Sequence, residues 1–455
     1  MALSMKGKAS GGLIGLPWEI PLEHWPSEHI AALPRGVSRH VVRFVRLEGK
    51  VVAIKETNPE IARREFKLLR RLQTAGAPCV TPLAVVTGRE SVDGKPLEAA
   101  LVTEHLQFSL PYRALFKQSL RSETVDRFLD ALAVLLVRLH LLGFYWGDVS
   151  LSNALFRRDA EQFTAYLVDA ETGDLHESLT DGQRDYDIEL ARTNIIGEMF
   201  DLEAQGSLHE SVDPIAVADR LEERYRELWR TLTRSATLTS NIPLEIANRV
   251  KELNEMGFDV AELDMRETDD GNALMIRPKI VDAGHHSRRL MRLTGLDVQE
   301  NQARRLLNDL DEHRAYANPN DDVGYAAHQW LLKIFEPTVR AVPREYRQKL
   351  EPAQVFHEIL DHRWYLAQEV GHDVPMSVAS ASYVKNILPN RPDEQAILGT
   401  SLAEMTAELP ALTAEVEARA ASAEEESEDN MGGWGDVEEP PAPEVVRRST
   451  RLAPE

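Results

Sequence analysis

The stretch of sequence that decides the fold lies between residues 139 and 153 and reads LHLLGFYWGDVSLSN. It begins at the end of an apolar-periodic segment, residues 128–142, which predicts a long helix ended by Gly143. The loop after this helix contains Asp148 and Asn153, an acid and an amide separated by four residues. In such a loop the carboxylate can orient a hydroxyl nucleophile or accept its proton, and the amide carbonyl can bind Mg²⁺.

A second carboxylate follows downstream. Asp169 ends the apolar strand predicted over residues 164–168, a position that suits a ligand of a hard metal ion. An aspartate at a strand end or in a turn is more often structural, so neither motif decides the function alone. The order of these motifs along the chain is a stronger indication of function than either motif alone.

A lysine ends an apolar strand upstream. Lys55 follows residues 51–54, and a lysine on the buried side of a strand needs an anionic partner because an unpaired buried charge is costly. Glu65 lies on the apolar stripe of the next predicted helix, which starts near Pro59. A pair with Lys55 explains an acid at that position; the alternative is that both residues lie on the surface.

The predicted elements are mostly strands at first and helices later. We expect two strands within residues 33–55, further strands over 80–86 and 99–106, and two short strands over 154–156 and 164–168. From Glu189 onward the pattern is almost wholly helical. The expected fold class is α+β. It comprises an N-terminal extension (1–27), a two-lobed domain with an antiparallel N-lobe sheet plus helix and a helical C-lobe (28–205), and an all-α domain (206–400).

In their order, these residues resemble the protein-kinase-like superfamily. Lys55 and Glu65 match the strand lysine and its helix partner, Asp148 and Asn153 match the catalytic-loop residues, and Asp169 matches the first residue of D-F-G. The resemblance extends over about residues 30–200.

The pattern around the loop narrows the resemblance. His140, Gly143 and the pair Gly147-Asp148 are similar to the loop of the lipopolysaccharide-kinase-like bacterial branch. The whole chain also resembles an uncharacterised actinobacterial family, of the DUF4032 type, in which a kinase-like domain precedes a helical domain of unknown function.

The resemblance implies ATP and Mg²⁺ as cofactors. Lys55 would hold the α- and β-phosphates with Glu65 orienting it, and Asp148 would position the acceptor hydroxyl. Asn153 and Asp169 would bind the metal ion.

Other positions follow from the same resemblance. Glu104 and Leu106 stand where the family's hinge contacts adenine, and Ser38 and Arg39 stand in the turn that covers the phosphates. Asp187 matches the buried aspartate that opens the next helix and buttresses the catalytic loop.

The chain departs from the family in three places. The phosphate-covering turn, residues 34–40, has a single glycine, and Asp169-Ala170-Glu171 stands in place of D-F-G. Only residues 172–184 separate this motif from the Asp187 region, and no A-P-E follows. That length leaves no room for a large peptide-binding segment, so a small molecule or a glycan is favoured as acceptor over a peptide.

Composition limits the partners and the cellular location that the protein can have. A net charge of −22 argues against a nucleic-acid partner, and the longest apolar stretch is too short and too charged to span a membrane. A single cysteine and the lack of a secretion signal favour the cytoplasm. Residues 418–455, acidic and proline-containing, are predicted to form a disordered tail.

Two functions are consistent with these residues. The first is an ATP- and Mg²⁺-dependent phosphotransferase with an unknown acceptor. The alternative is a nucleotide-binding pseudokinase or scaffold, whose helical domain or acidic tail binds a protein partner. The single glycine in the phosphate turn and the altered D-F-G favour the alternative, whereas the complete set of five polar site residues favours the enzyme.

Overall fold

The computed structural model describes residues 3–8, 11–31, 40–113, 122–206, 208–233, 236–238, 244, 247–248, 250–251, 258–267, 274–317 and 321–391. Ser38 and Arg39, predicted to cover the phosphates, lie outside the described residues, as does the predicted acidic tail over 418–455. None of the helices within the described residues is long and apolar enough to cross a membrane.

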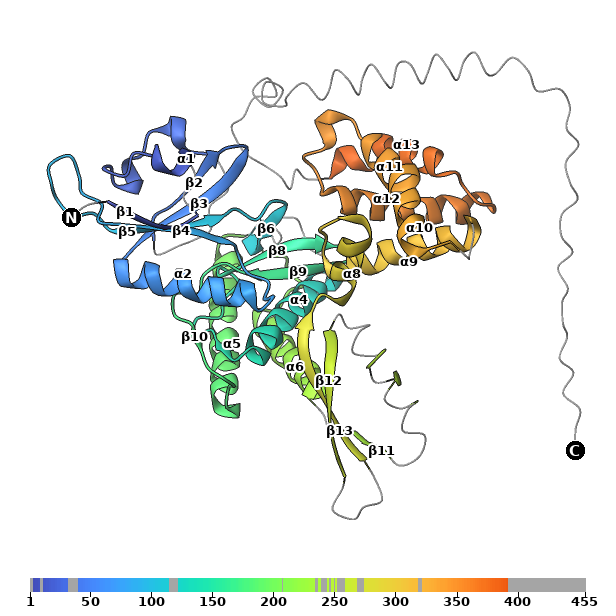
Figure 1. Cartoon of the computed structure of the whole chain (residues 1–455), viewed down its shortest axis with the longest axis horizontal. Coiled ribbons are helices and arrows are strands. Elements are labelled where there is room, and N and C mark those ends of the chain that lie inside the picture. Colours follow the sequence, from blue (N-terminus) through green and yellow to red (C-terminus); the bar gives the residue numbers. More distant parts are fainter. Residues whose placement is uncertain are drawn as a thin grey trace, which may run out of the picture. The chain divides into compact units, whose positions relative to one another are not determined.

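The N-lobe is built on a five-stranded antiparallel sheet with the order β1-β4-β5-β3-β2 (Figure 1). Its strands are β1 (Ser4–Gly7), β2 (Val42–Leu47), β3 (Lys50–Thr57), β4 (Pro82–Thr87) and β5 (Ala99–Glu104). The turn between β2 and β3 consists of Glu48 and Gly49, both with positive φ, the geometry that two-residue hairpins favour.

One face of this sheet is covered by α2 (Pro59–Thr74). The helix begins where predicted, because the Asn58 side chain accepts a hydrogen bond from the Glu60 N–H at 2.9 Å and Pro59 occupies the first turn. Its apolar stripe, which includes Phe66 and Leu69, packs in one core with residues such as Leu101 of β5. Glu65 lies on this stripe, 1% exposed.

The opposite face of the sheet is covered by the N-terminal segment, which the sequence analysis treated only as an extension. After β1 and α1 (Gly11–Ile14), the chain buries Trp18, Leu22 and Trp25 against residues that include Val52 and Ile54 of β3. Since successive side chains of a strand point to opposite faces, β3 contributes to this layer and to the α2 layer in alternation. The described part of residues 1–27 is therefore integral to the N-lobe.

The C-lobe follows the predicted order. The strand β6 comes before the long helix α4 (Ser122–Leu141), and β8 and β9 come after it. The three strands form a sheet with the order β6-β8-β9, and α5 and α6 complete the lobe. The bounds of the remaining elements are β6 (Ser109–Pro111), β7 (Phe144–Tyr145), β8 (Ala154–Asp159), β9 (Gln162–Leu167), β10 (Asp174–Leu175), α5 (Asp181–Ala204) and α6 (Pro214–Thr233).

The C-terminal part is largely helical, as predicted. Its described elements are α8 (His285–Thr294), α9 (Glu300–Ala317), α10 (Val323–Trp330), the π-helical turn η3 (Leu331–Phe335), α11 (Glu336–Arg340), α12 (Pro352–Val370) and α13 (Met376–Asn386). Between α6 and α8 the structure adds a three-stranded antiparallel sheet that the sequence analysis did not predict. Its strands are β11 (Ala236–Leu238), β12 (Phe258–Glu267) and β13 (Leu274–Ala283), in the order β11-β13-β12 (Figure 1).

A buried polar contact joins the C-lobe to the C-terminal helices. Asp159, at the end of β8 and 1% exposed, accepts a hydrogen bond from the Gln302 backbone N–H at 2.7 Å and another from the Asn301 side chain at 3.0 Å. Arg157 pairs with Glu351 at 2.6 Å nearby. The β8–β9 hairpin has Asn153 and Asp169 beside its open end. The C-terminal helices thus hold the other end of this hairpin, at its turn.

Candidate active site

The ammonium of Lys55 is the centre of the candidate site. It lies 2.7 Å from Oε2 of Glu65, 3.0 Å from Oδ2 of Asp169 and 3.2 Å from Oε2 of Glu171. β3 positions the lysine, α2 positions Glu65, and the segment after β9 positions the other two carboxylates. The predicted Lys55–Glu65 pair is present, and Asp169 joins it.

The charged groups of this cluster shift one another's pKa values. Burial lowers the pKa of Lys55, but the carboxylates of Glu65 and Asp169 outweigh burial and hold it well above its ordinary value. Burial raises the pKa of Glu65 to about 7, and the charge of Asp169 adds to this, while Lys55 opposes it. Lys55 therefore stays charged, and three carboxylates surround one cation.

Glu171 is a site residue that the sequence analysis did not assign. Its backbone N–H donates to Oδ1 of Asp169 at 2.9 Å, and its carboxylate lies 2.8 Å from Nε2 of His40. Carboxylate oxygens of Glu65, Asp169 and Glu171 lie within 4.8 Å of one another, a donor set that suits a hard divalent cation. The departure from D-F-G was the available signal, since it places an acid where the family has glycine.

Asp148 and Asn153 form the second part of the site. The Asn153 side chain donates through Nδ2 to the Asp148 carbonyl at 3.0 Å and to its carboxylate at 3.2 Å. This leaves the carbonyl oxygen of the amide as the atom that Asn153 can offer to Mg²⁺. Asn194 of α5, a residue that sequence reasoning missed, donates to Oδ1 of Asp148 at 3.3 Å.

Two hydrogen bonds join the Asp148–Asn153 loop to the Lys55 cluster. The Trp146 indole donates to the Asp169 carbonyl at 3.2 Å, and the Val168 N–H donates to the Asn153 carbonyl at 3.1 Å. The loop that carries Asp148 is thus tied to the strand end that carries Asp169.

Asp187 is completely buried and holds the loop that carries Asp148 in place. It accepts hydrogen bonds from the N–H groups of Trp146 and Gly147 at 2.7 and 2.8 Å, and it contacts His140 at 3.2 Å. Its expected buttressing contacts are present, but its position in the helix differs from the prediction. The capping box of Thr180 starts α5 at Asp181, so Asp187 lies in the second turn rather than at the opening.

Glu198, also from α5, anchors the far end of the loop. Its carboxylate accepts the N–H groups of Leu151 and Ser152 at 2.8 and 2.9 Å, and the Ser152 hydroxyl at 2.5 Å. Burial raises the pKa of Glu198, which these donors oppose. No sequence motif identified this residue, because its role depends on the packing of α5 against the loop.

The predicted hinge lies at the end of β5, beside β3. Glu104 pairs with Val52 in the β3–β5 ladder, and its side chain binds the ammonium of Lys50 at 2.7 Å. The Leu106 carbonyl accepts the Ser109 hydroxyl at 2.6 Å. The Glu104 N–H is also used, since it donates to the Thr81 carbonyl at 2.8 Å.

Comparison with known proteins divides the chain into two parts. Residues 52–195 match the lipopolysaccharide kinase (Kdo/WaaP) family. Residues 227–388 match DUF4032, a domain of unknown function. Two separate parts of the chain are therefore similar to two families, the first a kinase family and the second of unknown function, which confirms the two-part resemblance.

Individual proteins add little to this assignment. A search of curated proteins found no match. Among solved structures, one described as "WaaP in complex with acyl carrier protein" matches with 15% identity and a TM-score of 0.33, over 56% of this chain and 99% of that one.

Proposed function

We propose that the chain is an ATP- and Mg²⁺-dependent phosphotransferase. The observation that supports this most directly is the Lys55 ammonium held at 2.7 Å from Glu65 and 3.0 Å from Asp169. Phosphoryl transfer consists mostly of positioning the phosphates and neutralising their charge, and this cluster supplies a fixed cation beside carboxylates that suit a metal ion. The use of ATP and the single cysteine favour the cytoplasm as its location.

Each residue has a role in this proposal. Lys55 would contact the phosphates, with Glu65 holding its ammonium in place. Asp169 and the Asn153 carbonyl would hold Mg²⁺, which supplies charge neutralisation at the phosphates. Asp148 would orient the acceptor hydroxyl, and Asn194 would fix the carboxylate.

The segment after Asp169 favours a small acceptor. Residues 174–175 form β10, which pairs with β7 directly before the catalytic loop, and the His176 N–H donates to the Gly143 carbonyl at 2.9 Å. α5 then begins at Asp181. Because this segment is short and bonded to the lobe, it offers no extended surface for a peptide, and a small molecule or a glycan fits better.

Thermal melting with ATP, with and without Mg²⁺, tests the proposal without knowledge of the acceptor. We expect a Mg²⁺-dependent rise in the melting temperature, lost in Asp169→Asn and retained in Asp174→Asn, an exposed aspartate nearby. Slow release of phosphate from ATP, measured in the same samples, should also depend on Asp169. An equal shift and equal turnover in wild type and Asp169→Asn would contradict the assignment.

The pseudokinase alternative predicts a different result. It is favoured by the single glycine of the phosphate turn and by the three carboxylates that already surround Lys55. In that case Mg²⁺–ATP would raise the melting temperature without any turnover, and a protein partner of the helical part would become the expected ligand.

A further inference from the structure

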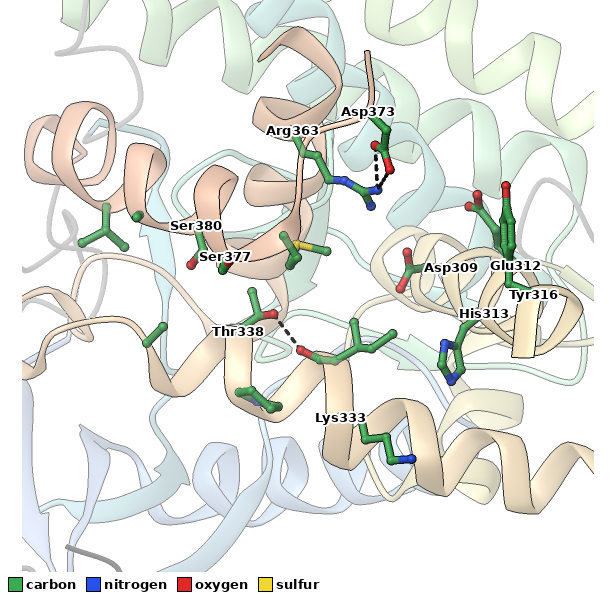
Figure 2. A pocket seen from close by; sticks show the side chains of 16 residues that line it. Asp309, Glu312, His313, Tyr316, Lys333, Thr338, Arg363, Asp373, Ser377 and Ser380 are labelled. Carbon is green, nitrogen blue, oxygen red and sulfur yellow. Dashed lines mark hydrogen bonds and ion pairs between the residues drawn. The ribbon is translucent and has the colours of Figure 1, made fainter. Parts of the chain in front are cut away.

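The helical C-terminal part contains a cavity of about 780 Å³, formed by residues of α9, η3, α11, α12 and α13 (Figure 2). Its size is within the range of sites for small organic molecules. None of its lining residues belongs to the candidate active site, and it lies in the part that matches DUF4032.

Part of the cavity wall is apolar and irregular in backbone. Ile334, Pro337, Met376 and Val384 line it, and Ile334 belongs to the π-helical turn η3. π-Helical turns are rare and occur often at functional sites. An apolar wall of this kind suits the hydrocarbon body of a ligand.

Two donors on the wall are used within the protein. Arg363 donates to both carboxylate oxygens of Asp373 at 2.8 and 2.9 Å and to the Val374 carbonyl at 2.7 Å. The Thr338 hydroxyl donates to the Ile334 carbonyl at 2.7 Å (Figure 2). The remaining side-chain oxygens are the carboxylates of Asp309 and Glu312, which only accept, and the hydroxyls of Tyr316, Ser377 and Ser380, which can donate or accept.

Two carboxylates on α9 face this cavity from one side. Figure 2 shows Asp309 and Glu312 on the same helix, three residues apart and therefore on one face. Asp309 accepts a hydrogen bond from the Trp330 indole at 2.6 Å, and burial raises its pKa because its charge has lost water. The wall also carries Lys333, which is exposed, the imidazole of His313, and Arg363, which is bound to Asp373; Arg363 and His313 both act on the charge of Asp309. Counted as lysine and arginine against carboxylates, the wall has two cations and three anions.

A buried hydroxyl on α13 lines another part of the wall. Ser380 is 4% exposed, and its Oγ has no hydrogen-bond partner within the described part of the chain. Leaving a buried polar atom unpaired costs about 1–3 kcal/mol, so a ligand group that pairs with it would gain affinity. This unpaired atom is independent of the carboxylates and also indicates a ligand.

We propose that this cavity binds a small organic cation, an amine on an apolar body. The ammonium would pair with Asp309 and Glu312, the body would pack on the wall formed by Ile334 and Met376, and Ser380 would accept or donate one further hydrogen bond. The net negative charge of the wall opposes nucleotides and other polyanions at this site. The inference is independent of phosphotransfer.

A set of three probes of similar shape tests the charge preference on the full chain. 2-Phenylethylamine, 2-phenylethanol and 3-phenylpropionate present a phenyl body with a cationic, neutral or anionic end. Isothermal titration and ligand-observed NMR should show that the amine binds at least about tenfold more tightly than the other two, because charge-assisted hydrogen bonds are the stronger kind. Failure of the amine to bind up to about 10 mM, an affinity below the range of specific sites, would overturn the proposal.

Variants locate the site. Asp309→Asn keeps an acceptor for the Trp330 indole but removes the charge, and Glu312→Gln removes the second charge without a change in shape. Each should weaken amine binding by about tenfold. Asp311→Asn is the matched control on the same helix, since Asp311 does not line the cavity.

A blocking variant covers the case in which Asp309→Asn does not fold. Ser377 is an exposed cavity residue of α13, and Ser377→Trp should abolish binding of the amine while the melting temperature of the protein changes little. Equal amine affinity in wild type, Glu312→Gln and Ser377→Trp, or tighter binding of 3-phenylpropionate than of the amine, would show that the assignment is wrong.

Discussion

The ammonium of Lys55 lies 2.7 Å from the carboxylate of Glu65, a side chain that is 1% exposed. This contact joins β3 to α2, and Asp169 and Glu171 complete a ring of carboxylates around the same cation. Three acids for one lysine is an excess of negative charge, which a metal ion would relieve. The proposed Mg²⁺ would be that second cation.

The first prediction concerns the competition between Lys55 and a metal ion. Lys55→Met removes the cation and leaves three carboxylates facing one another, so affinity for Mn²⁺ in the absence of nucleotide should rise roughly tenfold. Binding of Mg²⁺–ATP should fall in the same variant, because the phosphates lose their fixed cation. Titration followed by electron paramagnetic resonance measures free Mn²⁺ directly.

Lys50→Met is the control for this prediction. Lys50 also pairs with a carboxylate, that of Glu104 at 2.7 Å, but it is 66% exposed and lies outside the cluster. It should change neither affinity. Weaker Mn²⁺ binding in Lys55→Met than in wild type would show that the three carboxylates do not form a cation site.

The second prediction concerns pH. Burial and Asp169 raise the pKa of Glu65 from an ordinary 4.5 to about 7. Between these values the folded protein holds a proton that the unfolded chain loses, so the free energy of unfolding should fall as pH rises through this window. Glu65→Gln cannot ionise, and the pH dependence of wild type should exceed that of the variant by about 1–3 kcal/mol across the window. Urea unfolding at pH 4.5, 5.5, 6.5 and 7.5 measures it; a wild type that gains stability relative to Glu65→Gln as pH rises would contradict the expected sign.

The third prediction concerns the support of the catalytic loop. Asp187→Asn keeps one acceptor oxygen where two loop N–H groups and His140 now bind, so at least one buried donor loses its partner. We expect a loss of about 1–3 kcal/mol in the free energy of unfolding. Turnover of Mg²⁺–ATP should fall as well, since the position of Asp148 depends on the loop. Asp185→Asn, exposed on the same helix, should leave stability and turnover near the wild-type level.

Sequence patterns were sufficient to predict the helices and strands whose apolar residues recur with a clear period. β3 and α2 lie close to the predicted residues, and α4 ends next to its predicted end, because apolar periodicity, the Asn58-Pro59 start and the Gly143 stop are local signals. The start of α4, at Ser122, lies six residues before the predicted start of the apolar segment at 128. The pairing of Lys55 with Glu65 was predictable for the same reason, since a single acid on the apolar face of a helix needs a cationic partner.

Other features depend on tertiary contacts and left no such signal. Glu171 and His40 meet only when the segment after β9 folds back against β3. β12 is irregular, with register shifts between Asp259 and Glu262, which interrupt the two-residue alternation that identifies a strand. The N-terminal segment has no helical or strand period over most of its length, so its burial could not be derived from pattern.

That segment gives the last prediction. Arg89 is fully buried and donates to the carbonyls of Trp18 and Ile20 at 3.0 and 2.7 Å, to the Glu98 carbonyl at 3.0 Å, and to Glu56 at 2.6 Å. Glu56 is the neighbour of Lys55 in β3, so its side chain points to the opposite face of the sheet. Arg89 thus fastens the N-terminal segment to the strand that positions the site lysine.

Arg89→Met should reduce the free energy of unfolding by about 3–5 kcal/mol, because it leaves Glu56 and three carbonyls without their buried donor. Lys95→Met, an exposed position on the same β4–β5 connection, is the control and should have little effect. Urea unfolding followed by tryptophan fluorescence compares them, since Trp18 and Trp25 lie in the affected layer. If residues 1–27 were only an extension, as their sequence suggested, the two variants would unfold alike. A large difference would instead show that the segment is a required layer of the N-lobe, and its removal should then abolish the fold and any binding of Mg²⁺–ATP with it.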